Sequence, residues 1–104
     1  MPFVYLIGEI NNDNTFKIGV TKHKDISKRI AELQTGNSQE LYIKNYFETK
    51  YPYKLEKMLH RHYQNKNILN EWFELSNEDV KDFNNICLIY NDILNSLKDN
   101  PFFK

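Results

Sequence analysis

The sequence is poor in the residues that build several common kinds of site. Its 104 residues include a single cysteine, Cys87, which excludes an intramolecular disulfide framework and a cysteine-based zinc site. No His-x-x-x-His pair is present, so the three histidines form no typical zinc pattern. No apolar run approaches the ~20 residues of a bilayer-spanning helix, and the start Met1-Pro2-Phe3 does not resemble a signal peptide. These absences favour an intracellular protein that does not act on membranes.

The chain also lacks net charge, with 14 Lys or Arg against 14 Asp or Glu. The charges are nevertheless unevenly spread: residues 1–66 hold 11 basic against 7 acidic side chains, and residues 67–104 hold 3 against 7. The basic excess is densest over residues 17–29. A one-sided field of this kind attracts a phosphate backbone, although an ordinary solvated face is an equally good interpretation. We expect three of these lysines to bind substrate, namely Lys22, Lys24 and Lys28.

Hydrophobic periodicity predicts the elements of one small α+β domain. Residues rich in β-branched and aromatic side chains indicate strands at residues 3–10, 15–20 and 41–47. The first two form a hairpin around the polar turn Asn11–Asn14. Helical spacing of apolar residues predicts helices at 26–34, from Tyr51-Pro52 onward, and at about 77–98. The expected fold is therefore a three-stranded antiparallel sheet flanked by helices, the last of them long.

The predicted C-terminal helix divides the chain into two parts of one domain. Residues 1–76 form the expected core, and residues 77–104 form the helix that packs on it. The apolar face of this helix, which includes Ile89 and Ile93, is wider than a small sheet requires. We expect this face either to wrap the domain or to mediate self-association or contact with a protein partner.

The chain resembles the GIY-YIG nuclease superfamily through an ordered series of short motifs within residues 3–76. The series consists of Val4-Tyr5, Phe16-Lys17-Ile18-Gly19, Thr21, Lys28-Arg29, Leu33-Gln34-Thr35-Gly36-Asn37, Leu55-Glu56-Lys57-Met58-Leu59-His60 and Glu71-Trp72-Phe73-Glu74-Leu75. It looks like the small branch of the superfamily, common in phages and large DNA viruses, with Leu-Gln-Thr-Gly-Asn and Glu-Trp-Phe motifs. The location that follows is the cytoplasm or nucleus of a host cell.

The resemblance implies a metal-dependent cleavage of phosphodiester bonds in DNA. Such a reaction needs an oriented water, a cation on the phosphate and stabilisation of the leaving oxygen. The family's tyrosine, transition-state arginine and metal-holding glutamate correspond to Tyr5, Arg29 and Glu56 here. A single divalent ion, Mg²⁺ or Mn²⁺, is expected on Glu56. Among the weaker candidates, His60 matches a histidine of the branch and is either a proton carrier or a half-buried packing residue.

Two departures from the superfamily pattern alter the expected chemistry. Lys17 stands where most members have the tyrosine of the second motif, and an ammonium binds phosphate as a point charge. Where many members carry an asparagine after the metal-binding helix, Asn70 and Glu71 are both candidates.

The predicted function is a metal-dependent DNA endonuclease that uses Tyr5, Lys17, Arg29, Glu56 and His60. The alternative is a catalytically silent module on the same fold, which binds nucleic acid or a protein, as a viral inhibitor would. The form of the DNA substrate and the oligomeric state stay open at this point.

Overall fold

The computed structural model describes residues 2–22 and 25–97, which form five strands, three α-helices and one 3₁₀ turn. In chain order these are β1 (Phe3–Glu9), β2 (Asn12–Thr21), α1 (Ile26–Thr35), β3 (Leu41–Glu48), α2 (Pro52–His62), the 3₁₀ turn η1 (Gln64–Lys66), β4 (Asn67–Leu69), β5 (Trp72–Glu74) and α3 (Asn77–Ser96). The predicted α+β class and the long C-terminal helix are confirmed.

The strands form one antiparallel sheet in the order β3-β1-β2-β5-β4. The predicted count of three strands is therefore wrong, because two further strands of three residues each extend the sheet beyond β2. The pairing of β2 with β5 covers only Thr15, Phe16 and Lys17. Beyond Lys17 the edge of β2 is no longer paired with β5, and α2 packs against β2.

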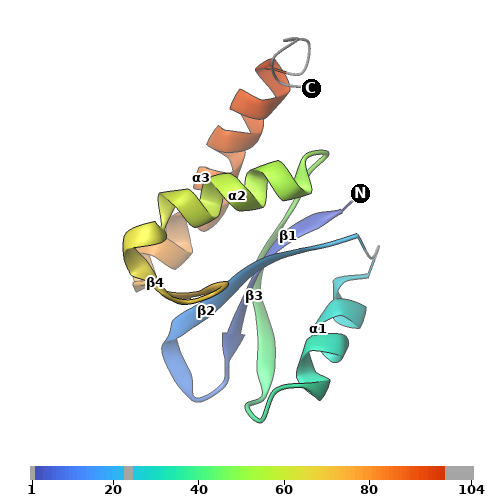
Figure 1. Cartoon of the computed structure of the whole chain (residues 1–104), viewed down its shortest axis with the longest axis vertical. Coiled ribbons are helices and arrows are strands. Elements are labelled where there is room, and N and C mark those ends of the chain that lie inside the picture. Colours follow the sequence, from blue (N-terminus) through green and yellow to red (C-terminus); the bar gives the residue numbers. More distant parts are fainter. Residues whose placement is uncertain (1, 23–24, 98–104) are drawn as a thin grey trace.

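Helices cover both faces of the sheet, with α1 on one side and α2 with α3 on the other (Figure 1). Alternation along β1 and β2 assigns each residue to a face, since successive strand side chains point in opposite directions. The larger core lies under α2 and α3 and includes Val4, Leu6, Phe16, Ile18, Leu55, Leu59, Phe73 and Phe83. The smaller core lies under α1, where Ile26, Ile30 and Leu33 pack on Tyr5, Ile7 and Leu41.

The helix boundaries follow from local chemistry. Asp25 caps α1, because its side chain accepts a hydrogen bond from the Ser27 backbone amide. Ser76 and Asp79 form a reciprocal capping box at the start of α3. Both caps agree with the sequence pattern. Gly36 follows α1 with φ −100°, so this helix ends without the left-handed glycine cap that is common at helix C-termini.

The long helix α3 packs on the same core as the rest of the chain. Val80, Phe83, Cys87 and Leu94 are buried against α2 and the sheet. Its C-terminal half projects beyond the sheet (Figure 1), and four apolar side chains of α3 or its C-cap are exposed: Leu88, Ile89, Ile93 and Leu97. The predicted end of the helix near Lys98 lies outside the described residues. Within the described part of the chain, no helix is long and apolar enough to cross a membrane.

Candidate active site

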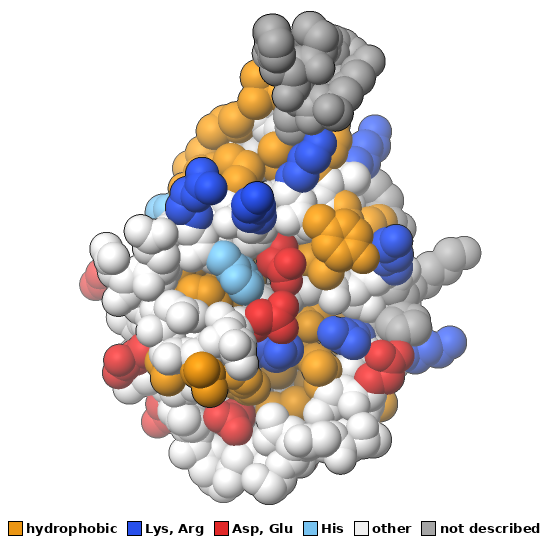
Figure 2. Space-filling model, viewed as in Figure 1, with side chains coloured by type: hydrophobic (Ala, Val, Ile, Leu, Met, Phe, Trp, Pro, Cys, Tyr) orange, Lys and Arg blue, Asp and Glu red, His pale blue; other side chains and the backbone are white. Residues whose placement is uncertain are grey.

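Polar side chains gather at the point where β5 leaves β2, in a cluster that we call the cleft: Tyr5, Lys17, Arg29, Glu56, His60 and Glu71. The Ile18 amide donates to the Glu71 carbonyl, 3.0 Å away, as the last link between the two segments. One face of α2 then approaches the free edge of β2 and presents Glu56 and His60, one helical turn apart. Figure 2 shows this face of the molecule, with acidic, basic and histidine side chains gathered around a hollow at its centre.

Gly19 allows Tyr5 to reach this cleft. The two residues are paired across β1 and β2, on the face of the sheet that α1 covers. A Cβ atom built on Gly19 would overlap the Tyr5 hydroxyl and ring, so the phenol occupies the space that a side chain would take. A glycine within a strand often marks a close approach, and here the approaching group is the Tyr5 side chain. Lys17 lies on the same face of β2, one pleat repeat from Gly19.

Tyr5 and Arg29 bring two unsatisfied donors together. The Tyr5 hydroxyl and the Arg29 Nε are buried atoms without a hydrogen-bond partner of ordinary geometry among the described residues. Burial raises the pKa of Tyr5, and the nearby Arg29 guanidinium only partly offsets this, so the phenol stays protonated at neutral pH. The Tyr5 hydroxyl raises the pKa of Arg29. Arg29 Nη1 also pairs with Glu32 at 3.2 Å, which fixes the guanidinium at the rim of the cleft.

Glu56 and Glu71 form a close carboxylate pair. Burial raises the pKa of Glu56 to about 7, and the charge of Glu71 and a hydrogen bond to it add to the shift. Burial also acts on Glu71, but the Lys17 ammonium more than compensates and lowers its pKa. At neutral pH the pair therefore retains part of a proton on Glu56, because two adjacent carboxylates in a half-buried site repel one another. A cation between them would remove that repulsion.

Lys17 is committed to Glu71 rather than free in the cleft. Its Nζ lies 2.7 Å from a Glu71 carboxylate oxygen, and it lies 5.8 Å from the centre of the Trp72 ring. The Lys17 side chain is only 15% exposed. The ammonium therefore serves as a fixed positive charge that orients Glu71 and keeps it ionised.

His60 is held by the backbone of β2. Its Nε2 lies 3.0 Å from the Ile18 carbonyl oxygen, and its ring packs edge-on against Phe73. A carbonyl oxygen only accepts hydrogen bonds, so Nε2 must carry a proton in this arrangement. A protonated nitrogen cannot bind a metal. Although ligand atoms of Glu56, His60 and Glu71 lie within 4.8 Å of one another, the carboxylate pair is the better metal site.

The donor set of the cleft fits a hard divalent cation. Mg²⁺ binds proteins through one or two carboxylates and completes its shell with water and substrate phosphate, and Mn²⁺ accepts the same ligands. Glu56 and Glu71 supply two such carboxylates, and ligand atoms of the two lie within 4.8 Å of each other.

The structure distinguishes the roles of Asn70 and Glu71, which the sequence left as alternatives. Asn70 has φ 52° in the two-residue turn between β4 and β5, a conformation that asparagine tolerates. Asn67 Nδ2 donates to the carbonyls of Asn70 and Trp72 and stabilises the turn. Glu71 follows immediately and reaches the cleft. Ile68 and Leu69 of β4 are exposed.

The lysines expected to bind substrate are placed differently from one another. Lys22, just after β2, lies with its Nζ 5.5 Å from the centre of the Tyr53 ring, beside a pocket that Arg29 also lines. Lys28 is exposed on α1, and no hydrogen bond or ion pair identified among the described residues links it to the cleft. Lys24 lies outside the described residues. Sequence reasoning missed Tyr53; its only signal was an aromatic residue three positions before Glu56.

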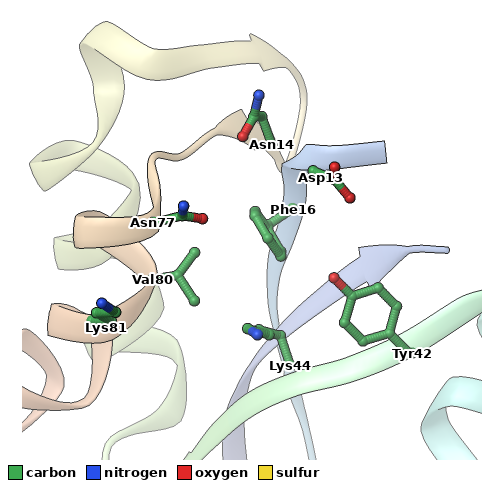
Figure 3. Close-up of a pocket in the computed structure, with 8 residues that line it drawn as sticks. All are labelled: Asp13, Asn14, Phe16, Tyr42, Lys44, Asn77, Val80 and Lys81. Atoms are coloured by element: carbon green, nitrogen blue, oxygen red, sulfur yellow. The ribbon is translucent and has the colours of Figure 1, made fainter. Parts of the chain in front are cut away.

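A second pocket, of about 500 Å³, lies away from this cleft, between the β1–β2 hairpin, β3 and the start of α3 (Figure 3). It is lined by Asp13, Asn14, Phe16, Tyr42, Lys44, Asn77, Val80 and Lys81. None of the predicted site residues is among them. The cleft at the edge of β2 is therefore the better candidate, since it alone combines the carboxylate pair with Arg29 and Tyr5.

Comparison with known proteins identifies one family. A family model described as the T5orf172 domain matches residues 2–88, which include β1 to β5 and the first half of α3. No curated protein and no solved structure matches the chain significantly. The match covers every residue of the cleft, including Tyr5, Arg29, Glu56 and Glu71.

Proposed function

The chain belongs to the T5orf172 domain family, a phage-associated domain of the nuclease type, and we propose that it is a metal-dependent DNA endonuclease of the GIY-YIG kind. The observation that carries this proposal is the composition of one cleft. It joins a close carboxylate pair, Glu56 and Glu71, to Arg29, whose Nε has no hydrogen-bond acceptor among the described residues. A phosphodiester bound together with a divalent cation would give Arg29 an acceptor and would place a positive charge between the two carboxylates.

Each side chain has a role that its surroundings support. Arg29 binds the scissile phosphate, because its Nε has no hydrogen-bond acceptor of ordinary geometry among the described residues and its guanidinium lies beside the Tyr5 hydroxyl. The guanidinium neutralises the charge that grows on the phosphate in the transition state. Glu56 and Glu71 hold the Mg²⁺ or Mn²⁺ ion, and Lys17 keeps Glu71 ionised. When bound, the ion supplies Lewis acidity toward the phosphate and lowers the pKa of a bound water.

Tyr5 and His60 act on protons rather than on the metal. The raised pKa of Tyr5 makes it a hydrogen-bond donor that orients the attacking water or a phosphate oxygen, not an anionic base. His60 donates from Nε2 to the Ile18 carbonyl, which leaves its Nδ1 as the nitrogen able to accept a proton. His60 therefore serves as a proton carrier at the rim of the cleft, between α2 and β2.

A plasmid-nicking assay with Mg²⁺ and with Mn²⁺ tests the proposal. The parent protein should convert supercoiled plasmid to the nicked form, and Glu56→Ala should lose at least about 10²-fold in rate, because it removes one of the two ligands. Glu48→Ala is the matched control, since Glu48 is an exposed glutamate on β3. Equal nicking by the parent and by folded Glu56→Ala would refute the proposal.

A second candidate is favoured by α3. Leu88, Ile89, Ile93 and Leu97 expose apolar surface on one helix, the pattern of a contact with a second copy or with another protein. A silent, protein-binding role on this scaffold would follow if the folded parent did not nick DNA with either ion.

A further inference from the structure

Beside the cleft lies a pocket that shares Arg29 with it and whose other lining residues have no part in the proposed chemistry. Its volume is about 430 Å³, and it is lined by Val20, Thr21, Lys22, Arg29 and Tyr53. This size falls in the range of small-ligand sites, roughly 300–1,000 Å³. Arg29 forms one wall of the pocket and also faces Tyr5 in the cleft. Whatever occupies the pocket is therefore adjacent to the group that binds the scissile phosphate.

Tyr53 gives the pocket a flat apolar wall. The residue is 57% exposed, in the first turn of α2, three positions before Glu56 and seven before His60. These spacings place all three on one side of the helix, so Tyr53 continues the face of α2 that lines the cleft. An aromatic ring exposed to this degree contributes little to the core, yet it is oriented by a neighbour.

Lys22 is that neighbour, and it adds a positive charge to the pocket. Its Nζ lies 5.5 Å from the centre of the Tyr53 ring, within the range of a cation–π contact. Together the pocket offers an aromatic surface, an ammonium and the edge of a guanidinium. A nucleic-acid strand presents a base and phosphates side by side, and single strands are bound by stacking on aromatic side chains beside cationic ones.

We propose that this pocket is a subsite for an unpaired nucleotide next to the scissile phosphate, with its base stacked on Tyr53 and its phosphate on Lys22. The inference rests on the proposed function and narrows the substrate to DNA with an unpaired base at the cleavage point, as in a single strand, a flap or a bulge. A base inside an intact duplex cannot stack on Tyr53, because both of its faces are covered by its neighbours.

Fluorescence anisotropy in EDTA tests the subsite without any turnover. A labelled single-stranded oligonucleotide and the corresponding blunt duplex are titrated with the parent, Tyr53→Ala and Tyr53→Phe. Tyr53→Ala should bind the single strand about 5- to 100-fold more weakly. Its affinity for the duplex should change less than twofold, and Tyr53→Phe should restore single-strand binding because it keeps the ring. Tyr46→Ala, an equally exposed tyrosine on β3, should bind both probes as the parent does.

Three results would overturn the inference: unchanged single-strand binding by Tyr53→Ala, an equal loss on the duplex, or an equal loss in Tyr46→Ala. Because the titrations contain EDTA and therefore no free divalent metal, their outcomes are independent of the nicking assay. Loss of nicking in Glu56→Ala together with unchanged binding by Tyr53→Ala would retain the nuclease and reject the subsite. Weaker single-strand binding by Tyr53→Ala together with nicking that persists in Glu56→Ala would retain the subsite and reject the nuclease.

Discussion

The two sides of the cleft differ in the kind of polar group that they present. The side formed by β1, β2 and α1 presents donors, and the Arg29 Nε and Tyr5 hydroxyl lack acceptors among the described residues. The side formed by α2 and the segment before β5 presents acceptors, and burial with mutual repulsion raises the pKa of Glu56 to about 7. A protein selected only for stability would pair these groups internally, since unsatisfied buried polar groups cost stability. The contrast agrees with the proposed function, since a phosphodiester bound with a divalent cation would complement both sides.

The largest expected effect comes from removing the donor side alone. Arg29→Ala should reduce the rate of DNA cleavage by roughly 10³-fold or more, the usual cost of losing a transition-state arginine. The same variant should still gain thermal stability on addition of Mg²⁺, because the carboxylate pair is intact. Arg61→Ala is the control, as Arg61 is exposed on α2 and lies in a groove beside α3. If Arg29→Ala no longer gained thermal stability on addition of Mg²⁺, the donor side would be needed for metal binding, and the two sides would not act independently.

An intermediate effect is expected from Gly19→Ala, which displaces Tyr5 without changing any polar group. The new methyl group would overlap the Tyr5 hydroxyl, and a shift of this order costs about 10²-fold in rate when it misplaces a reacting group. Gly36→Ala is the matched control, because a Cβ there meets no atom within 4 Å and its φ of −100° suits alanine. Cleavage rates and melting temperatures of the two variants provide the test. If the folded Gly19→Ala variant cleaved DNA as fast as the parent, Tyr5 would have no role in cleavage.

The smallest expected effect concerns the acceptor side and is a dependence of stability on pH. The pKa of Glu56 is raised from 4.5 to about 7 in the folded protein, so its stabilising contribution is complete below pH 4.5 and is lost as pH rises through about 7. In EDTA the melting temperature of the parent should therefore fall between pH 5 and pH 8 by about 5 °C more than that of Glu56→Gln. Addition of Mg²⁺ at pH 8 should raise the melting temperature of the parent again and leave that of Glu56→Gln unchanged. Identical pH profiles of melting temperature for the two proteins would show that the pKa of Glu56 is not raised in the folded protein.

The local elements of the fold were predictable because their signals lie within a few residues. The alternation along β1 and β2, the apolar spacing of Ile26, Ile30 and Leu33, and the caps at Asp25 and Ser76 all follow from short-range rules. The strands β4 and β5 escaped prediction because three residues are too few to show an alternating pattern. Their existence depends on pairing with the edge of β2.

The sequence by itself determined the fold class, the caps and the set of polar residue types that resemble a nuclease site. Only the tertiary structure decided which of them meet. Lys17 and Glu71 are 54 positions apart and form an ion pair because β5 pairs with β2 in one register. Tyr5 reaches the cleft because its partner in the opposite strand is Gly19. Local periodicity assigns each side chain to a face of its own element, whereas register and packing between distant segments determine which faces come together.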